Sequence, residues 1–412
     1  MNATKEKIKK GCKQTSIGII PNDWEVKHFG DVSDIDKESL NSNTPKDYEF
    51  DYISLSDIDS DEFKIESSKQ VFDKAPSRAR RIVKQGDILM STVRPNLQGF
   101  SLIRNRVNNL IASTGFAVIT TRKCSNEYLF QYLFSDEIQR QFYQLIVGSN
   151  YPAINSSDVK KLKIPIPALP EQQKIASILS TWDDAITKQK SLVEQTEKRN
   201  QGLAQQLLTG KKRLNGFDEK WKPQKIKDFA FEQSIKNKEN KDYIVLSCTK
   251  HNGLVPSLEY FGRQIFSENL ETYKIVEKGS FAYATNHIEE GSIGYQKTFD
   301  NALISPMYTV FKTDNTIVDE FLFRLLKSHT YIHEYQKRME GSIDRRGGLR
   351  WSEFAKIKVE VPELNEQNAI NEFLEMGNKE LCLLEQQLAS LQNEKKGLMQ
   401  KLLTGEVRVK IN

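Results

Sequence analysis

Few side chains of this 412-residue chain have the spacing that enzyme chemistry requires. His329 and His333 are four residues apart, which places two metal ligands on one helix face, but no third ligand accompanies them. The acidic residues at 57–61 are better explained by a solvated turn than by a nuclease centre. Gly210-Lys211 is not a phosphate-binding loop, because Gln205 occupies the position of its first glycine. These patterns favour a binding protein over an enzyme and predict no metal site.

Arginine, asparagine and glutamine side chains offer chemistry of another kind, the hydrogen bonding of base edges. Arginine pairs with guanine, and asparagine or glutamine pairs with adenine. Candidates lie in polar loops of both halves of the chain, where each is explained equally well as a solvated loop residue. In the first half they are Arg94, Asn96, Gln98, Asn150 and Tyr151, and in the second half they are Asn286, His287, Arg345, Arg346 and Arg350.

Two basic clusters suit phosphate groups, which fix the register of a protein on DNA without reading its sequence. They are Arg78-Ala-Arg80-Arg81 and Lys211-Lys212-Arg213. The chain as a whole is only mildly basic, since 60 lysines and arginines stand against 55 acids. Local patches must therefore carry the case for nucleic-acid binding, and simple exposed charge remains the alternative for both clusters.

Composition limits the class of protein. At about 150 residues per domain, 412 residues predict two or three domains. The hydrophobic fraction of 38% and the mean hydropathy of −0.57 are typical of a soluble protein. Four widely spaced cysteines fit a reducing cytoplasm. We expect a cytoplasmic protein with no signal peptide and no membrane span, because no long apolar run occurs.

The elements that position these loops are set by an internal repeat. Residues 169–210 match residues 364–405 without a gap, at an offset of 195. Each copy opens with Leu-x-Glu-Gln and closes with Leu-Leu-Thr-Gly. Gly210 and Gly405 suit the left-handed position that follows a helix. The repeat predicts four parts: residues 1–168 (body one), a long helix over 169–210, residues 211–363 (body two) and a long helix over 364–406.

The bodies repeat as well. Short β-type segments and one helix recur in the same order in both, whereas loop lengths and loop residues differ. The predicted strands are 52–55, 88–93, 116–121 and 163–167 in body one and 243–247, 281–284, 308–312 and 358–362 in body two, and the predicted helices are 127–135 and 320–328. A rigid frame with variable loops is the usual arrangement for a changeable binding surface.

Both long helices carry an apolar stripe of the coiled-coil type. The residues predicted to pack are Ile175, Ile178, Trp182 and Ile186 in the first helix and Ile370, Phe373, Leu381 and Leu384 in the second. If the two helices pair within one chain, connectivity makes them antiparallel and returns the C-terminus to body one. Pairing between two chains of a homodimer is the alternative.

In this order, the motifs resemble those of the DNA-specificity (S) subunits of Type I restriction–modification systems, over nearly the whole chain. The resemblance rests on the two helices with Leu-Leu-Thr-Gly ends and on the segments 86–91, 94–95, 113–116 and 163–173. Body two departs from the pattern at Gly279-Ser280 and at Ser305-Pro306-Met307. The resemblance implies an α+β fold in which two target recognition domains are separated by two antiparallel helices that form a coiled-coil-like spacer.

The resemblance also implies a function. Each body would read one half of a bipartite DNA target, and the helices would set the spacer and dock two methyltransferase subunits. Restriction subunits would join the full complex, and S-adenosylmethionine, ATP and magnesium would bind the partner subunits, leaving this chain without a cofactor. Two other classes remain open: a coiled-coil scaffold whose heads bind something other than DNA, and an enzyme whose site has no recognisable motif.

Overall fold

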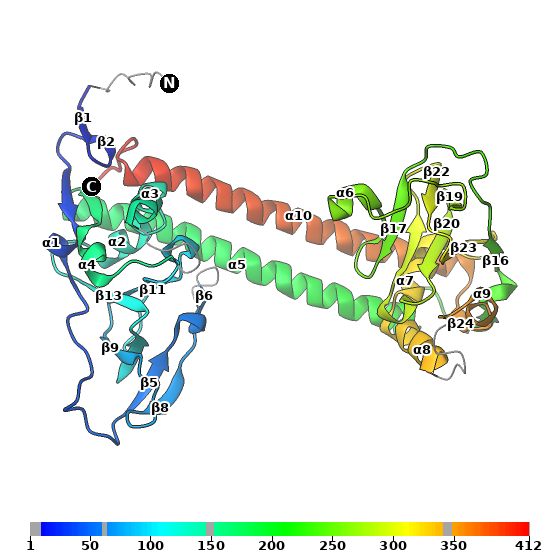
Figure 1. Cartoon of the computed structure of the whole chain (residues 1–412), viewed down its shortest axis with the longest axis horizontal. Coiled ribbons are helices and arrows are strands. Elements are labelled where there is room, and N and C mark those ends of the chain that lie inside the picture. The colour runs from blue at the N-terminus through cyan, green and yellow to red at the C-terminus, as the bar shows by residue number, and fades with distance from the viewer. Residues whose placement is uncertain (1–9, 60–63, 146–151, 341–347, 412) are drawn as a thin grey trace. The chain divides into compact units, whose positions relative to one another are not determined.

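The computed structural model describes residues 10–59, 64–145, 152–340 and 348–411. The chain forms two compact units, of which unit 1 comprises Met1–Leu192 with Leu384–Asn412 and unit 2 comprises Val193–Leu383. Body one lies in unit 1 and body two in unit 2, and each long helix contributes to both units (Figure 1). Within the described ranges, no helix is both long enough and apolar enough to cross a membrane.

Body one contains two four-stranded sheets. Their strand orders are β11-β10-β13-β4, which is antiparallel, and β8-β5-β12-β9, in which β5 and β12 are parallel. The strands are β4 (Ser33–Ile35), β5 (Glu49–Ile53), β8 (Ser68–Val71), β9 (Ala79–Val83), β10 (Ile88–Ser91), β11 (Phe100–Leu102), β12 (Leu110–Ser113) and β13 (Phe116–Thr121). Two-stranded pairs are β1 (Cys12–Thr15) with β2 (Gly18–Pro21), β3 (Glu25–His28) with β14 (Lys163–Ile166), and β6 (Ile58–Asp59) with β7 (Lys64–Ile65).

Helices cover one side of body one and close its main core. They are α1 (Phe29–Val32), α2 (Asn126–Tyr132), α3 (Asp136–Leu145) and α4 (Ser156–Lys161), with the 3-10 turns η1 (Leu55–Asp57) and η2 (Pro95–Leu97). The main core includes Trp24 and Phe142 of body one together with Ile175 and Leu179 from the first long helix and Leu402 from the end of the second. The C-terminal end of the second long helix is therefore part of the core of unit 1.

Body two repeats the two sheets in the same pairing pattern. Their orders are β16-β23-β20-β21 and β18-β17-β22-β19, with β17 and β22 parallel. The strands are β16 (Ala230–Gln233), β17 (Val245–Thr249), β18 (Gly253–Pro256), β19 (Lys274–Glu277), β20 (Ser280–Ala284), β21 (Ile293–Gln296), β22 (Asn301–Ile304) and β23 (Tyr308–Thr313), and a separate pair joins β15 (Lys222–Lys225) to β24 (Lys358–Val361).

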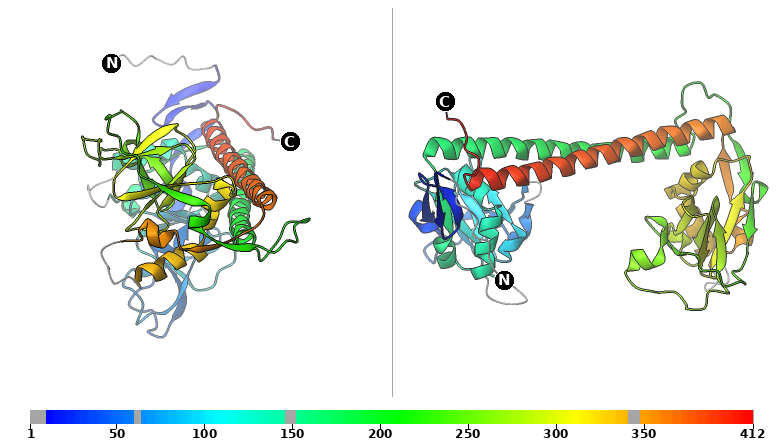
Figure 2. Two further views of the ribbon diagram at one scale, coloured as in Figure 1. Left: turned by 90° about the vertical axis from the view of Figure 1, so that its right-hand side faces the viewer. Right: turned by 90° about the horizontal axis from the view of Figure 1, so that it is seen from above.

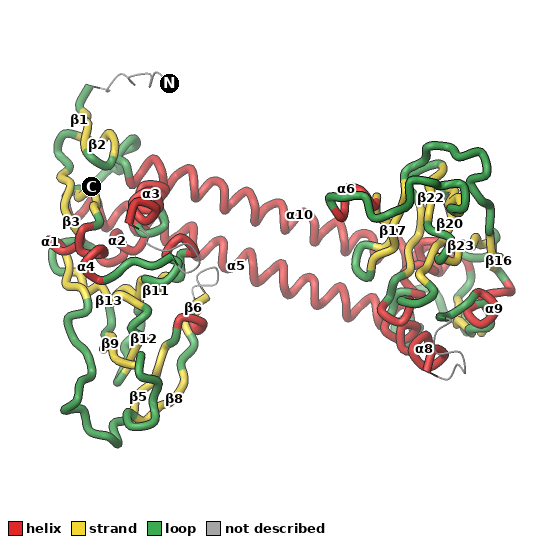
Figure 3. The backbone as a smooth tube through the Cα atoms, viewed as in Figure 1, coloured by secondary structure: helices red, strands yellow, loops and turns green. Residues whose placement is uncertain are grey.

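The helices of body two are α6 (Ser257–Phe261), α7 (Asp319–Leu326), α8 (His329–Glu340) and α9 (Trp351–Phe354), with the 3-10 turns η3 (Ile226–Asp228) and η4 (Ile288–Glu290). Helices and strands are interspersed within each body (Figure 3). The core of body two includes Leu207 and Leu208 from the end of the first long helix, with Ile370 and Leu374 from the start of the second. His329 and His333 are exposed on α8.

The long helices are α5 (Leu169–Leu208) and α10 (Leu364–Leu403), which lie side by side in Figures 1 and 2. In unit 1, Gln189 Nε2 donates to the Leu384 carbonyl at 2.9 Å, and Lys395 pairs with Asp183. In unit 2, Asn200 Nδ2 donates to the Gly377 carbonyl at 2.7 Å. Positions that rise along α5 fall along α10, so the pairing is antiparallel, as the connectivity predicts. Gly210 and Gly405 have φ of +67° and +72°, the left-handed stop predicted for them.

The apolar stripe is less uniform than a coiled-coil seam. Ile175 and Ile178 pack against the core of body one and Ile370 belongs to the core of body two, because each helix end is embedded in a body. Between the ends, Ile186 is buried and Trp182, Leu381 and Leu384 are half-buried. Phe373 differs from the prediction: it is 36% exposed, and its neighbour Leu374 takes the buried position. The predicted α+β fold with two repeated bodies and two antiparallel helices is confirmed.

Candidate nucleic-acid interface

A clamp around a buried glutamate fixes each body to the long helices. In unit 1, the Glu171 carboxylate at the start of α5 accepts a hydrogen bond from Trp24 Nε1 at 3.2 Å. The Arg408 guanidinium binds the same carboxylate at 2.6 and 2.9 Å and also reaches Asp23. The guanidinium beside Asp23 lowers the pKa of that carboxyl. Charge-assisted bidentate bonds of this kind hold both partners in one geometry.

Unit 2 contains the same clamp, made of residues at matching positions. Trp221 Nε1 donates to Glu366 at 3.1 Å, and Arg213 binds that carboxylate at 2.6 and 2.7 Å. Glu171 and Glu366, like Arg408 and Arg213, are 195 residues apart. Arg213 belongs to the basic cluster assigned to phosphates from the sequence, so that assignment needs a correction: its guanidinium is occupied by Glu366.

The glutamine that follows each clamp carboxylate positions a helix of the body. Gln172 accepts from the Ser125 backbone at 2.8 Å and donates to the Pro167 carbonyl. Gln367 accepts from the Val318 backbone at 2.7 Å and donates to the Pro362 carbonyl. Ser125 and Val318 are the N-caps of α2 and α7. In both units, the Glu-Gln pair at the start of the long helix joins that helix to its body. The repeated Leu-x-Glu-Gln motif therefore has the same structural role in each copy.

Three segments of body one meet at the end of β10. The backbone and hydroxyl of Thr92 both donate to the Gly115 carbonyl, at 2.9 and 2.8 Å. The neighbouring Thr114 amide donates to the Arg78 carbonyl at 2.8 Å. The Arg94 amide donates to the Pro152 carbonyl at 2.7 Å. The exposed residues Arg78 and Arg94 therefore belong to one connected surface.

The loop that holds the predicted readers of body one has a strained backbone. Arg94 and Gln98 flank η2 and have positive φ values of 50° and 56°. Each such residue costs about 1–2 kcal/mol, and strain of this kind gathers at binding sites. Asn96 lies on η2, where its Oδ1 is buried without a hydrogen-bond partner among the described residues. The structure thus brings Arg94, Asn96 and Gln98 together on one short turn.

Arg80 and Arg81 have internal partners. The Arg81 guanidinium lies 3.0 Å from Asp36, whose side chain is only 5% exposed. Arg80 donates to its neighbour's carbonyl and lies 4.9 Å from the ring centre of Phe72. Removal of Arg81 would leave a buried carboxylate without its counter-charge. Within the cluster 78–81, Arg78 is the most accessible candidate for a phosphate contact.

The equivalent surface of body two is built from matching backbone contacts. The Leu349 amide donates to the Thr285 carbonyl at 2.9 Å, as the Ile154 amide does to Thr92 in body one. A Cβ atom at Gly348 would lie 2.3 Å from Oδ1 of the exposed Asn286 and 2.5 Å from the Thr285 carbonyl, so this close approach requires glycine. Arg350 is exposed at the N-cap of α9.

His287 sits in a more acidic setting than its counterparts in body one. It is the N-cap of η4, and its Nδ1 lies 3.6 Å from Glu290. Among the described residues, His287, Glu289 and Glu290 bring potential metal-ligand atoms within 4.8 Å of one another, an arrangement that sequence reasoning did not single out. The four remaining predicted residues, Asn150, Tyr151, Arg345 and Arg346, lie outside the described residues.

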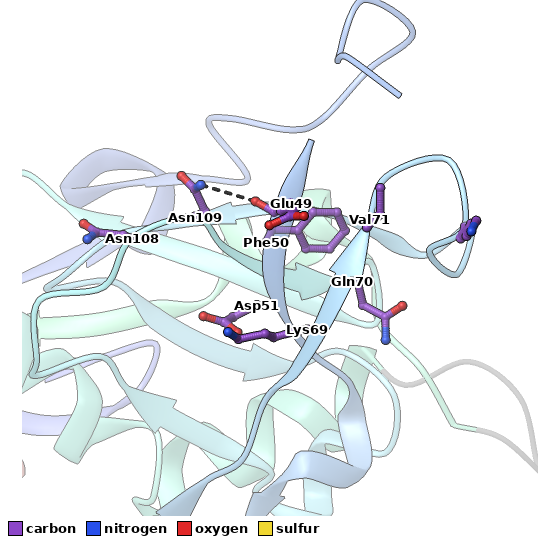
Figure 4. A pocket seen from close by; sticks show the side chains of 9 residues that line it. Glu49, Phe50, Asp51, Lys69, Gln70, Val71, Asn108 and Asn109 are labelled. Atoms are coloured by element: carbon purple, nitrogen blue, oxygen red, sulfur yellow. Dashed lines mark hydrogen bonds between the residues drawn. The ribbon is translucent and has the colours of Figure 1, made fainter. Parts of the chain in front are cut away.

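A groove of body one lies away from these loops. It has a volume of about 490 Å³ and lies over β5 and β8, where Glu49, Asp51 and Lys69 contribute side chains (Figure 4). Asn109 donates to the Glu49 carbonyl at 3.2 Å on its rim. None of the predicted site residues is among its described lining residues. Its lining carries two carboxylates against two lysines, Lys69 and Lys74, so its charge does not favour DNA phosphates, and the loops hold the candidate interface.

Comparison with known proteins connects this geometry to a family. The Type I restriction modification DNA specificity domain matches residues 21–195 and again residues 218–393. The chain belongs to this family. The two matches each span one body and most of the following long helix, so the family's unit is the repeat itself.

Relatives match over the whole length or over one repeat. The Type I restriction enzyme MjaVIII specificity subunit of Methanocaldococcus jannaschii is 25% identical over 420 residues, which cover 95% of this chain and 94% of that protein. The Type I restriction enzyme HindI specificity subunit of Haemophilus influenzae is 30% identical over 170 residues, 40% of this chain and 36% of that protein.

Solved structures share the fold. The HsdS subunit from Thermoanaerobacter tengcongensis has a TM-score of 0.56 and 21% identity, covering 94% of this chain and 98% of that one. A chain from a study of assembly and conformational transition of the type I R-M system has a TM-score of 0.64 and 20% identity, covering 94% and 99%. Both likenesses support the fold of this family member.

Proposed function

We propose that this chain is the DNA-binding specificity subunit of a Type I restriction–modification complex, in which each body reads one half of a bipartite target. The observation that carries the proposal is the contrast between frame and loops. Three contacts recur in both bodies: the clamp, the glutamine that follows its carboxylate, and the backbone contact to Thr92 or Thr285. The loops on these frames differ in residues and in charge. Two copies of one frame with different polar loops suit two different half-sites.

Each predicted loop residue has a role in this proposal. Arg94, Asn96 and Gln98 in body one, and Asn286, His287 and Arg350 in body two, are the base-reading candidates among the described residues. Arg78 is the phosphate-binding candidate, because it is exposed on the same connected surface as Arg94. Arg80 and Arg81 support that surface from within. Asn150, Tyr151, Arg345 and Arg346 remain candidates from the sequence.

The long helices provide the surface for partner subunits in this proposal. In unit 2, α10 exposes Met376 and Leu383 (61% and 59%) beside the partly exposed Phe373. In unit 1, Leu192 on α5 is 46% exposed. Phe373, Met376 and Leu383 follow one another at spacings of three and seven residues, so they lie on one face of α10, and an apolar strip of this kind suits a partner surface. Two methyltransferase subunits would cover them, and restriction subunits would join the larger complex.

The catalytic groups belong to the partners in this proposal. S-adenosylmethionine would bind the methyltransferase subunits, and ATP with magnesium would bind the restriction subunits. The chain itself then contributes recognition and assembly. Methyl transfer to DNA by the purified chain alone would contradict this assignment.

Methylation sequencing tests the proposed function. A host that carries this chain and its methyltransferase partner should gain one methylated motif, made of two short half-sites and a fixed spacer. A host with the methyltransferase alone is the control and should lack it. A seven-residue insertion at matched points of both helices adds about 10 Å while keeping the packed faces in phase, and should lengthen the spacer by about three base pairs. The absence of a bipartite motif would overturn the proposal.

A further inference from the structure

Each body presents one large aliphatic side chain to solvent at its candidate interface. In body one this residue is Leu97, which is 65% exposed on η2. In body two it is Met307, which is 68% exposed in the turn between β22 and β23. A single exposed aliphatic residue needs no special explanation. These two differ in being held on rigid turns beside the candidate base-reading residues.

The turn that holds Leu97 is fixed on both sides. Buried Pro95 begins it, and the backbone amides of Leu97 and Gln98 bond the carbonyls of Arg94 and Pro95 at 2.9 and 3.0 Å. Ser91 Oγ donates to the Val93 carbonyl at 2.7 Å, and Arg94 is bonded to Pro152. With two residues in the left-handed region, this backbone stores strain while leaving Leu97 in water. Burial of Pro95 helps to fix the turn, but burial of Leu97 does not contribute to this conformation.

The surroundings of Leu97 suit a nucleic acid. Arg94, Asn96 and Gln98 share its turn, and residues 88–100 contain no acidic residue. The helix that packs against η2 is α3, which carries Tyr143, 69% exposed. DNA offers apolar surface only at thymine methyl groups and at the faces of its base pairs. An aliphatic tip among cationic and amide side chains therefore fits a DNA groove, where the tip can meet a base and the cations can meet phosphate.

Met307 lies beside the candidate reading loop of body two, but on a different turn from the one that holds Leu97 in body one. Its carbonyl accepts from Thr285 Oγ1 at 3.3 Å, so the turn lies beside the Asn286 loop. The matching residue of body one is Gly115, whose carbonyl is bonded by Thr92. A Cβ atom there would lie 2.8 Å from Leu55, which fills the space. In body two the last residue of η4, in the place of Leu97, is Glu290, and the apolar residue of that turn, Ile288, is buried, so that loop offers no counterpart of Leu97.

We propose that Leu97 and Met307 make the apolar base contacts of the two half-sites, Leu97 from the loop after β10 and Met307 from the turn before β23. This inference rests on the proposed function and adds to it two specificity-determining residues that are neither charged nor hydrogen bonding. Each side chain contributes to one half-site, and neither touches phosphate.

Methylation sequencing of hosts that carry Leu97→Ala or Met307→Ala with the methyltransferase partner tests this. Leu97→Ala should relax one or two base pairs of one half-site, raising methylation of sequences that differ there at least about tenfold. Met307→Ala should relax the other half-site only. Leu258→Ala, which truncates a 54% exposed leucine on α6, is the control and should leave the motif unchanged.

Binding by the purified complex separates a base contact from a phosphate contact. Leu97→Ala should lower the affinity for duplex that contains the target motif, without changing the salt dependence of binding. Arg78→Ala should instead reduce the slope of log affinity against log salt concentration by about one. A variant that methylates nothing still decides the matter. Reduced discrimination against duplex changed at one or two base pairs of one half-site, with discrimination against a fully scrambled half retained, supports the proposal, and undiminished discrimination at every base pair overturns it.

An unchanged motif in either alanine variant would overturn the assignment of that residue, and relaxation of both halves by one variant would indicate a general defect in place of a base contact. Failure of the proposed function itself looks different, because the wild-type chain would then produce no bipartite motif at all.

Discussion

Body one and body two have the same frame and different interfaces. Thr92 and Thr285 occupy the same position in the two bodies. The carbonyl of each accepts a hydrogen bond from a backbone amide just before the last short helix, from Ile154 before α4 and from Leu349 before α9. Beyond that threonine the bodies diverge: body one continues into a turn with Arg94 and Leu97, and body two continues into η4 with Glu289 and Glu290. The buried contacts are therefore constrained by folding, whereas the surface just beyond them is free to follow a different target.

Even inside the frame, the two bodies place their hydroxyl–carboxylate pairs differently. Thr120 of body one donates its hydroxyl to the buried Asp87, next to β10. Thr313 of body two, which aligns with Thr121, donates its hydroxyl to the half-buried Asp319, the first residue of α7. Burial raises the pKa of both carboxyls. Both the hydroxyl and the carboxylate therefore stand at different positions in the two bodies.

The largest expected difference between the units concerns the clamps. Arg213→Ala leaves the Glu366 carboxylate, 3% exposed, without its counter-charge, and should lower the unfolding free energy of unit 2 by roughly 3–5 kcal/mol. Arg408→Ala should cost unit 1 less, because Arg408 is 44% exposed against 25% for Arg213 and water weakens its pairing. Hydrogen exchange in denaturant, followed by mass spectrometry, assigns each loss to its unit.

Lys212→Ala is the matched control, since it removes an exposed cation next to Arg213 and should change neither unit measurably. Equal destabilisation of both units by Arg213→Ala would show that the clamps do not act locally. A larger loss from Arg408→Ala than from Arg213→Ala would break the argument from exposure.

The glutamines that follow the clamp carboxylates, Gln172 and Gln367, should differ by a smaller amount in their contributions to the unfolding free energy. The N-cap of α2 is Ser125, whose hydroxyl accepts from Tyr128, whereas the N-cap of α7 is Val318, which has no side-chain cap. Gln367→Ala should therefore cost unit 2 about 2–3 kcal/mol, and Gln172→Ala should cost unit 1 about 1–2 kcal/mol. Chemical denaturation with exchange readout at α2 and α7 measures both.

The exposed neighbour Gln173 gives the control, because Gln173→Ala changes the same helix turn without touching the body. If Gln172→Ala and Gln367→Ala lower the unfolding free energy of their units equally, another contact compensates for the missing side-chain cap of α7.

The sequence predicted the frame well because the frame depends on periodic features. The offset of 195, the apolar spacing and the helix-ending glycines were enough to find α5, α10 and their antiparallel return. Predicted and observed strands coincide at 116–121, and β10 begins where Gly86-Asp87 placed it. The helices 127–135 and 320–328 were predicted slightly too long, since α2 ends at Tyr132 and α7 ends at Leu326.

What the sequence did not reveal depends on contacts between distant residues. Arg213 and Arg81 look like exposed cations in the sequence, and only the fold brings Glu366 and Asp36 to them. The clamp itself had a signal, because its glutamate and its arginine both repeat at the offset of 195. Leu97 had none, since an apolar residue in a loop is ordinary until its burial is known. The residues of the interface therefore remain predictions.

The smallest expected effect tests whether the two carboxylate positions, 87 and 126, are coupled within one frame. In body one, Asn126 occupies the position of Asp319 and donates to the Gly86 carbonyl, next to Asp87. Asp87→Ser and Asn126→Asp give body one the residues of body two at these positions. Each alone should destabilise unit 1, by removing the acceptor of Thr120 or by adding a second carboxylate. Together they should recover about 1 kcal/mol of the sum, because Asp87→Ser removes the carboxylate that would repel the one introduced at position 126.

The pH dependence of unfolding provides the second readout. Burial raises the pKa of Asp87 in the folded state, so the wild-type unfolding free energy should fall as pH rises from the ordinary value of 3.8 through the raised pKa. Asp87→Ser should flatten that dependence in unit 1, and the double substitution should restore it. Unit 2, where Asp319 is untouched, is the internal control. If the losses in unfolding free energy are additive and the pH dependence is not restored, Asp87 and Asp319 have different roles in their bodies.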